Sequence, residues 1–266
     1  MSRQELEQYR SDGFFVRQRV FVGAALTGLC AAADRAAARA VAACADGRAY
    51  YLDGKRFVDT VDATVQFEHT PGSETPRVIE PVHHFEPSID ALLDDERLVQ
   101  PMRDLVGCQE VALWTDKLNL KSAYGSGFPW HQDAPYWIHS CAHVHALPNV
   151  MVALDDADLV NGCFRVIRGS HRHGNLPGTD DGSQLGGLLT DIKRIDLRDE
   201  VALALPAGSL AFFDPYTVHG SQPNRSPRQR RALVLTYQPA GHQMLKAPRV
   251  RNCGVQLLPS RPSTGL

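Results

Sequence analysis

Short apolar segments separated by turn residues fill the second half of this chain. From residue 111 onward, Gly, Pro, Asn or Asp bound the segments VALWTDKLNL, NVMVALDD, CFRVI, LALPAGSLAFFD and RALVLTY. Segments of this length and spacing are typical of strands in a sandwich or barrel, whereas helices need longer periodic runs. The pattern therefore predicts a mainly β fold with helices packed outside it.

The first half of the chain predicts a helical layer. Residues 3–12 and 22–45 have helical composition, and the second segment is rich in alanine. Residues 50–68 indicate weak strand, and residues 92–106 indicate a short helix. With 266 residues, of which 43% are hydrophobic, we expect a single domain. The predicted domain covers residues 1–266, with its helical layer over about 1–48 and its β core over about 110–240.

Charge and cysteine content exclude several classes of protein. The chain has 28 Lys and Arg against 30 Asp and Glu, a net charge of -2, which gives no reason to expect a nucleic acid or a membrane surface as partner. The uncharged stretch over residues 20–33 is too short to span a bilayer. The six cysteines show no CxxC spacing, which is typical of reduced thiols. We expect a cytoplasmic protein, and its oligomeric state is not indicated.

The sequence PWHQDAPYW places His131 and Asp133 two residues apart. If residues 130–134 form a strand, both side chains share one face and offer two ligands to one metal ion. A distant strand would add the third ligand of a 2-His-1-carboxylate set, which leaves positions open on iron(II). The candidate is His219, which follows the predicted strand and turn GSLAFFDPYTV. An HxD triplet also arises by chance, so a structural, hydrogen-bonded histidine is the alternative.

Three longer blocks carry a family resemblance over about residues 116–237: DKLNLKSAYGSGFPWHQDAPYW, NGCFRVIRGSHRHG and GSLAFFDPYTVHGSQPNRSPRQRRALVLTY. Together they resemble the phytanoyl-CoA dioxygenase family of iron(II)- and 2-oxoglutarate-dependent oxygenases. The resemblance implies a double-stranded β-helix, which is a cupin-like jelly roll. It also implies that His131, Asp133 and His219 bind Fe(2+), and that 2-oxoglutarate and O2 are cosubstrates.

The resemblance places the cosubstrate arginine at Arg230. The family has an arginine eleven residues after the distal histidine, His219 in this chain. A planar guanidinium suits the far carboxylate of 2-oxoglutarate, because it can make two parallel hydrogen bonds to it. The neighbouring Arg231 would point to the opposite face of a regular strand.

Further cosubstrate contacts follow from the same resemblance. Ser221 corresponds to the family's hydroxyl partner, and Gln132 matches a family position near the cosubstrate. Lys117 and Lys121 are additional candidates, because related proteins use residues of this strand or a lysine further upstream. This chain has Arg77 where the upstream lysine is expected, and an ordinary solvated cation is the alternative for each of these positions.

Two loops are candidates for the mouth of the predicted barrel. The Gly- and Asp-rich residues 174–187 predict a long loop inserted between strands, and such loops often act as lids. His83 and His84 lie in a second loop, where they could contact a substrate or have a structural role. Tyr136 and Trp137, just after the HxD triplet, could line the pocket or pack in the core.

The resemblance implies an enzyme that hydroxylates an unactivated carbon of a small-molecule substrate, a natural-product or metabolic intermediate, with release of succinate and CO2. Epimerisation, desaturation and cyclisation start from the same substrate radical and are alternatives. Asp133 argues against halogenation, because halogenating relatives have a small residue in its place. Two other classes stay open: a non-catalytic jelly-roll binding protein, against which the cosubstrate arginine argues, and a cupin-like metalloenzyme that does not use 2-oxoglutarate.

Overall fold

Strands outnumber helices in the described part of the chain. The computed structural model describes residues 1–247 and 249–254. Its helices are α1 (Arg3–Asp12), α2 (Gly23–Ala43), α3 (Pro87–Leu92), α4 (Glu96–Val106) and α5 (Ala134–Trp137). Its strands are β1 (Phe14–Arg17), β2 (Arg48–Leu52), β3 (Lys55–Asp59), β4 (Thr64–Phe67), β5 (Pro76–Glu80), β6 (Val111–Lys121), β7 (Phe128–His131), β8 (Asn149–Ala153), β9 (Phe164–Ile167), β10 (Glu200–Leu203), β11 (Leu210–Phe213), β12 (His219–Ser221), β13 (Arg230–Pro239) and β14 (Asn252–Cys253).

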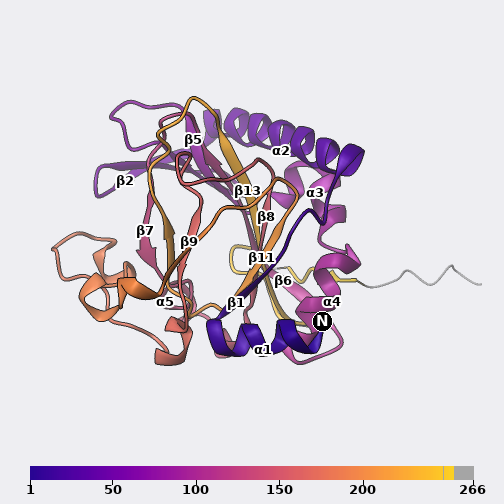
Figure 1. Ribbon diagram of the computed structural model, residues 1–266. Coiled ribbons are helices and arrows are strands. Elements are labelled where there is room, and N and C mark those ends of the chain that lie inside the picture. The colour runs from indigo at the N-terminus through magenta and orange to yellow at the C-terminus, as the bar shows by residue number, and fades with distance from the viewer. Residues whose placement is uncertain (248, 255–266) are drawn as a thin grey trace, which may run out of the picture.

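The strands form two antiparallel sheets (Figure 1). Within the described residues, the large sheet has 10 strands in the order β1-β11-β8-β13-β6-β5-β4-β3-β2, with β14 paired to β6. The small sheet has the order β10-β9-β12-β7. Strands that are distant in sequence are thus neighbours in space, as a jelly roll requires. The predicted mainly β jelly roll with flanking helices is confirmed.

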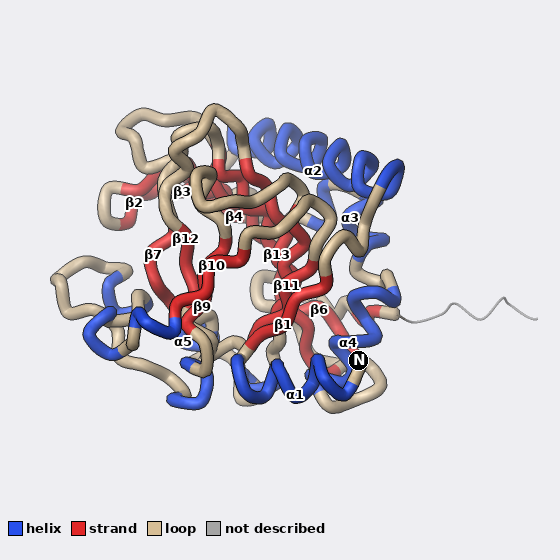
Figure 2. The backbone as a smooth tube through the Cα atoms, in the orientation of Figure 1, coloured by secondary structure: helices blue, strands red, loops and turns tan. Residues whose placement is uncertain are grey.

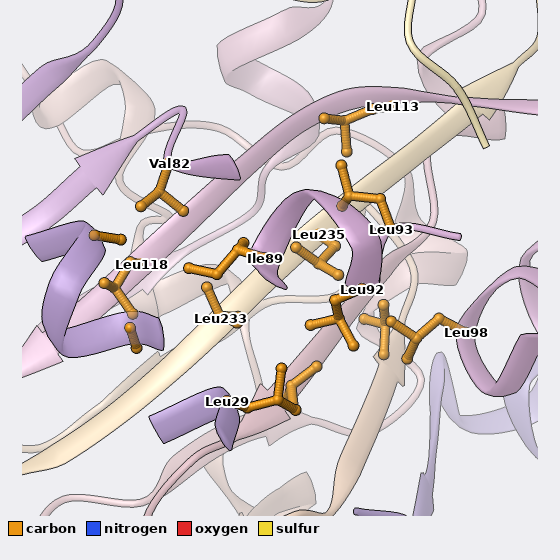
Figure 3. Close-up of a cluster of buried hydrophobic side chains, with 14 of the residues drawn as sticks. Leu29, Val82, Ile89, Leu92, Leu93, Leu98, Leu113, Leu118, Leu233 and Leu235 are labelled. Atoms are coloured by element: carbon orange, nitrogen blue, oxygen red, sulfur yellow. The ribbon is translucent and has the colours of Figure 1, made fainter. Parts of the chain in front are cut away.

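Helices α2, α3 and α4 cover the outer face of the large sheet (Figure 1). Apolar side chains from both layers meet there, among them Leu29 of α2, Ile89 of α3, Leu118 of β6 and Leu233 of β13 (Figure 3). Packing removes the apolar side chains of both the helices and the sheet from water, and this burial is the main source of stability for such a layer. The helices therefore cover this part of the outer face of the large sheet.

The amino-terminal helices follow the sequence closely. The helices predicted over residues 3–12 and 22–45 are confirmed as α1 and α2. The helix predicted over residues 92–106 is present as α4, but it begins only at Glu96, because α3 ends at Leu92 and is separate from it. The side chain of Asp95 accepts a hydrogen bond from the backbone N–H of Arg97 and so begins a new helix, as a favoured N-cap residue does.

Residues 50–68 form parts of three strands instead of one weak strand. Asp53 and Gly54 have φ angles of 48° and 72°, which is the turn that an Asp-Gly pair favours between two antiparallel strands. β2 and β3 pair across this turn. With β4 and β5 they extend the large sheet well beyond β6.

One row of residues crosses the inner face of this extended sheet. Phe57 of β3 is paired with Gln66 of β4, Gln66 with Val78 of β5, and Val78 with Asn119 of β6. Directly paired residues in antiparallel strands point to the same face. The row therefore joins the β2–β3 hairpin to the centre of the molecule along one surface.

A long segment between β9 and β10 lies beside the small sheet (Figure 2). The part that we name the 174–190 loop contains the residues predicted as a loop over 174–187, and that prediction is confirmed. It is joined to β7 by a bridge between His131 and Leu189 and by a hydrogen bond from the N–H of Thr190 to the carbonyl of Trp130. Among residues 1–247 and 249–254, no helix is long and apolar enough to cross a membrane.

Candidate metal centre and its cavity

A cavity of about 290 Å³ lies between the two sheets. Its wall is built by β6 and β13 of the large sheet, by β7 and β12 of the small sheet, by the β2–β3 hairpin and by the 174–190 loop. Apolar side chains make up much of this wall, and a few charged groups converge on it. This combination is typical of a site for small molecules.

His131, Asp133 and His219 meet at one side of this cavity. His131 ends β7, His219 begins β12, and the two are direct partners in the register of the small sheet. Each of the three side chains offers one ligand atom, and these atoms lie within 4.8 Å of one another. Two imidazoles and one carboxylate at this spacing fit a single metal ion with positions left open.

Asp133 reaches the histidines through a turn, so the strand predicted over residues 130–134 is wrong. β7 ends at His131, and Asp133 has helical angles, φ -79° and ψ -35°, in front of α5. Its backbone N–H donates to the carbonyl of Pro215 at 3.0 Å, and Nδ2 of Asn149 donates to its Oδ2 at 3.1 Å. The carboxylate is thus fixed by β8 and by the segment before β12, not by strand alternation.

Both histidines are held in the form that binds a metal. Nδ1 of His131 is 2.8 Å from the carbonyl oxygen of Pro129, and Nδ1 of His219 is 2.9 Å from that of Thr217. An Nδ1–H that donates to a carbonyl leaves the lone pair on Nε2. Burial and then the neighbouring imidazole lower the pKa of His131 to about 3, and burial lowers the pKa of His219. Both rings are therefore neutral at pH 7.

Lys117, a predicted cosubstrate contact, lies beside the three candidate metal ligands. Its Nζ is 3.7 Å from Oδ1 of Asp133 and 3.9 Å from Oε1 of Glu80 on β5. Burial opposes the ionisation of Asp133, but the positive charge of Lys117 outweighs it and lowers the pKa of this carboxyl. Lys117 therefore lines the cavity with its ammonium group engaged by two carboxylates.

The two neighbouring arginines of β13 lie on opposite faces of the large sheet. Arg230 lines the cavity and is 5% exposed, and its Nε is buried without a partner among the described residues. Arg231 lies on the helix side, paired with Asp155 at 2.7 Å and with Asp34 at 2.6 Å. Burial lowers the pKa of Arg230 to about 10, so it is charged at pH 7. A buried cation without a counterion is costly, and this geometry indicates an anionic ligand.

Ser221 lines the cavity, whereas Lys121 does not reach it. Nζ of Lys121 donates to Oγ of Ser221 at 2.7 Å, to the carbonyl of Gly162 at 3.0 Å and to the carbonyl of Gln222 at 2.5 Å. Its three donors are thus used by the protein itself. The structure places Lys121 behind the wall, where it orients Ser221, instead of at the predicted cosubstrate contact.

Gln132 also lies away from the cavity. Its Nε2 donates to the carbonyls of Gly174 and Tyr216, and its Oε1 accepts from the N–H of Leu176. These contacts show that its side chain points into the base of the 174–190 loop. The structure assigns it the anchoring of that loop, in contrast to the predicted cosubstrate contact.

Arg77, at the position expected for a family lysine, also lines the cavity wall. Its guanidinium lies 3.9 Å from the ring centroid of Phe128, donates to the backbone of Ser126 and Gly127, and is 3.7 Å from the carboxylate of Glu68. These contacts hold the start of β7. Its charge is therefore balanced within the protein, unlike that of Arg230.

The remaining candidates divide between pocket and core. His83 faces Asp116, with Nδ1 2.7 Å from Oδ1, and neither His83 nor His84 lines the cavity. Of the two roles considered for these histidines, the structure therefore supports the structural role over a substrate contact. Tyr136 lines the cavity, whereas Trp137 is 1% exposed and packs in the core.

The sequence did not single out the residues at the outer end of the cavity. Lys55 and Phe57 of β3, Gln66 of β4 and His69 line this end, and Leu185 of the 174–190 loop closes it. The Asp-Gly pair is the signal that predicts the hairpin. The position of the hairpin across the cavity depends on pairing between strands that are distant in sequence, and no local sequence pattern predicts it.

A jelly roll with two histidines and one carboxylate between its sheets defines the class of cupin-like metalloproteins. Within this class, the chain belongs to the family described as phytanoyl-CoA dioxygenase (PhyH), because the model of that family matches residues 9–232. The resemblance inferred from the sequence is thereby confirmed.

Individual relatives agree with this assignment. The chain is 32% identical over 153 residues to a 2-aminoethylphosphonate dioxygenase from Uncultured bacterium HF130_AEPn_1. This match covers 58% of this chain and 55% of the relative. It is 29% identical over 187 residues to a probable alpha-ketoglutarate-dependent hypophosphite dioxygenase from Stutzerimonas stutzeri, over 65% of this chain and 62% of the relative. The matches thus span less than two thirds of these relatives. The apoform crystal structure of EctD from S. alaskensis superposes with a TM-score of 0.69 at 25% identity, over 92% of this chain and 79% of that one.

Proposed function

We propose that this chain is an iron(II)- and 2-oxoglutarate-dependent dioxygenase that hydroxylates an unactivated carbon of a small-molecule substrate. The observation that carries the proposal is Arg230, a buried guanidinium without an anionic partner among the described residues, in the cavity of the three candidate ligands. A dicarboxylate that binds the metal at one end and this guanidinium at the other satisfies both features. The relative from Stutzerimonas stutzeri, described as alpha-ketoglutarate-dependent, supports the same choice.

Each site residue has a defined task in this proposal. His131, Asp133 and His219 would hold the iron, which would supply the centre for O2 activation and for oxidative decarboxylation of 2-oxoglutarate to succinate and CO2. Arg230 binds the far carboxylate of 2-oxoglutarate. The hydroxyl of Ser221, whose oxygen accepts from Lys121, is free to donate its own proton to that carboxylate.

Apolar side chains surround the candidate ligands. The rings of Phe164 and Phe213 lie 5.3 Å and 4.9 Å from that of His219, and Met151 is 3% exposed on the same wall. These side chains exclude water from the ligand set, which strengthens every electrostatic interaction there. The site is therefore suited to oxidise a bound substrate without loss of oxidising equivalents to solvent.

The proposed substrate is a small molecule, a metabolic or natural-product intermediate, as the size of the cavity supports. The proposed location is the cytoplasm, which the six free cysteines support. Epimerisation, desaturation and cyclisation would use the same residues, and analysis of the product separates them from hydroxylation.

Anaerobic titration with iron(II) and 2-oxoglutarate tests the proposal. The wild type should develop the weak visible charge-transfer band of the chelated complex. Arg230→Met should raise the 2-oxoglutarate concentration needed for half of the band by about 10- to 100-fold, since hydrogen bonds to a charged group contribute about 1.5–3 kcal/mol. Arg225→Met, which changes an exposed arginine outside the cavity, is the matched control. Bound iron without a band in the wild type would contradict the proposal and favour a cupin-like metalloprotein that does not use 2-oxoglutarate.

A further inference from the structure

The outer end of the cavity is a distinct surface formed by the edge of the large sheet. The row from Asn119 through Val78 and Gln66 to Phe57 continues the cavity wall from the centre to the β2–β3 hairpin. Lys55 shares the face of Phe57, because the two are separated by two positions on β3. We name the surface formed by Lys55, Phe57, Gln66 and His69 the outer subsite.

The charged groups of the cavity wall can be paired one by one. Arg77 is balanced by Glu68 at 3.7 Å, and Lys117 by Glu80 and Asp133 at 3.9 Å and 3.7 Å. Under the proposed function, Arg230 binds the far carboxylate of 2-oxoglutarate. The remaining cation of the wall is Lys55, which makes no ion pair within residues 1–247 and 249–254. The outer subsite therefore carries one positive charge that the protein does not neutralise.

Neutral polar groups and apolar walls accompany this charge. Nε2 of Gln66 lies 3.5 Å from Nε2 of His69, so an amide and an imidazole are available beside Lys55. Leu52 and Leu185 add apolar surface on either side. One cation, hydrogen-bonding groups and apolar walls are what a small molecule with an apolar body and one anionic group requires.

The 174–190 loop encloses the outer subsite, and the hairpin itself holds it there. The carboxylate of Asp53 accepts hydrogen bonds from the backbone N–H groups of Gln184 at 2.7 Å and Leu185 at 2.9 Å. This contact sets Leu185 over the subsite. A ligand in the outer subsite is therefore bounded by the hairpin on one side and by the loop on the other, which limits its size.

We propose that the outer subsite binds the anionic group, a carboxylate or a phosphonate, of the substrate, with Lys55 as its ion-pair partner. The proposal rests on the proposed function, because the oxidised carbon must lie between this group and the metal. Lys55 thereby becomes a specificity-determining residue that selects anionic over neutral substrates. The remainder of the substrate packs against Phe57, Leu52 and Leu185.

Binding to the protein loaded anaerobically with iron(II) and saturating 2-oxoglutarate tests this inference. The probes are methylphosphonate, butanoate and neutral 1-butanol, titrated by calorimetry, with perturbation of the charge-transfer band as a second readout. We expect at least one anion to bind better than the alcohol, and the stronger anion then identifies the group. In Lys55→Gln its affinity should fall about 10- to 100-fold, since a hydrogen-bonded charge in a partly enclosed site contributes about 1.5–3 kcal/mol.

Two further variants test whether a loss of anion affinity in Lys55→Gln is due to the lost charge. Lys55→Arg should restore most of the affinity, because it keeps the charge, whereas Lys193→Gln changes an exposed lysine outside the cavity and should have no effect. An anion affinity that is equal in the wild type and in Lys55→Gln would overturn the inference, because the anion would then bind the metal directly. Equal affinity for anions and alcohol would also overturn it. In both cases a normal charge-transfer band would leave the proposed function intact, whereas absence of the band in the wild type would contradict the proposed function itself.

Discussion

The two ends of the cavity differ in how their polar groups are held. At the metal end, His131 and His219 each face a backbone carbonyl, and Asp133 is fixed by Asn149 and by Lys117. At the outer end, Lys55 makes no ion pair with the described residues and lies on a hairpin at the sheet edge. The metal end is thus preorganised by the fold, whereas the outer end depends on its ligand.

This difference suggests a division of tasks, in which the metal end carries out the chemistry and the outer end selects the substrate. Two of the three candidate metal ligands, His131 and His219, belong to β7 and β12, which are paired with each other inside the fold, and Asp133 lies in the turn just after β7. The outer subsite belongs to a hairpin and a loop, which can change without disturbing the central strands. Substitutions should therefore have effects that decrease from the metal end to the outer end.

Asp133→Ala should have the largest effect. It removes the one carboxylate of the ligand set, so iron(II) affinity should fall by more than about 100-fold, which exceeds the 10- to 100-fold loss typical of a residue that only supports a ligand. The fold should persist, because Asp133 lines a cavity and contributes little apolar contact. Metal titration measures the first effect and thermal unfolding the second. The control is Asp46→Ala, which changes an exposed aspartate outside the cavity. Metal affinity equal to that of the wild type would remove Asp133 from the ligand set.

Asn149→Ala should have a smaller effect on the metal and a clear effect on stability. Its Nδ2 orients Asp133, and its Oδ1 accepts from Oγ1 of Thr236 at 2.6 Å. We expect an iron(II) affinity lower by about 10-fold and a free energy of unfolding lower by about 1–3 kcal/mol. Thr236→Val removes the second hydrogen bond and keeps the first. If both variants lose metal affinity equally, Asn149 acts through general stability and not through Asp133.

Much of the metal end was predictable because its signals are local. His131 and Asp133 are close in sequence, and the strand alternation that places Arg230 and Arg231 on opposite faces requires only that β13 be regular. His219 was a candidate because it follows a predicted strand and turn, and the resemblance to a known family implied the same residue. The conformation of Asp133 was not predictable, because it depends on hydrogen bonds to Pro215 and Asn149, which are distant in sequence.

The outer end was missed for a related reason. The Asp53-Gly54 turn is a local signal for a hairpin, but the place of the hairpin is set by the pairing of β3, β4, β5 and β6. Lys121 and Gln132 are the opposite case, because the sequence predicted a cosubstrate contact for each and neither lines the cavity. Gln132 lies between two cavity residues in sequence and Lys121 lies two residues after one, yet their donors bond to backbone carbonyls behind the wall.

Asp53→Ala tests whether the hairpin holds the 174–190 loop. Without the carboxylate, the N–H groups of Gln184 and Leu185 lose their acceptor. We expect amide hydrogen exchange at these two residues to become about tenfold faster, as for a contact of about 1–2 kcal/mol, with little change in iron(II) affinity. Asp62→Ala, in the next turn of the same sheet, is the control. Unchanged exchange in Asp53→Ala would mean that the contacts of the loop with Gln132 and β7 position it without the hairpin.

His69→Gln should have the smallest effect, and it is visible only as a function of pH. Burial, followed by the nearby charges of Arg77 and Lys55, lowers the pKa of His69 to about 4 from 6.5. Between these values the unfolded chain binds a proton that the folded protein does not, so the stability contributed by the neutral ring is present above pH 6.5 and is lost as pH falls towards 4.

The stability of the wild type relative to His69→Gln should therefore decrease by about 1 kcal/mol between pH 7 and pH 4.5, a value reduced for partial solvent screening. Urea unfolding of the metal-free proteins at both pH values measures this, with the exposed His139→Gln as control. Parallel pH dependence of the wild type and His69→Gln would mean that His69 titrates near its ordinary pKa and shares the positive charge with Lys55. A divergence of the expected sign would leave Lys55 as the charged group of the outer subsite, so that anion selection there depends on one side chain while the metal end depends on several.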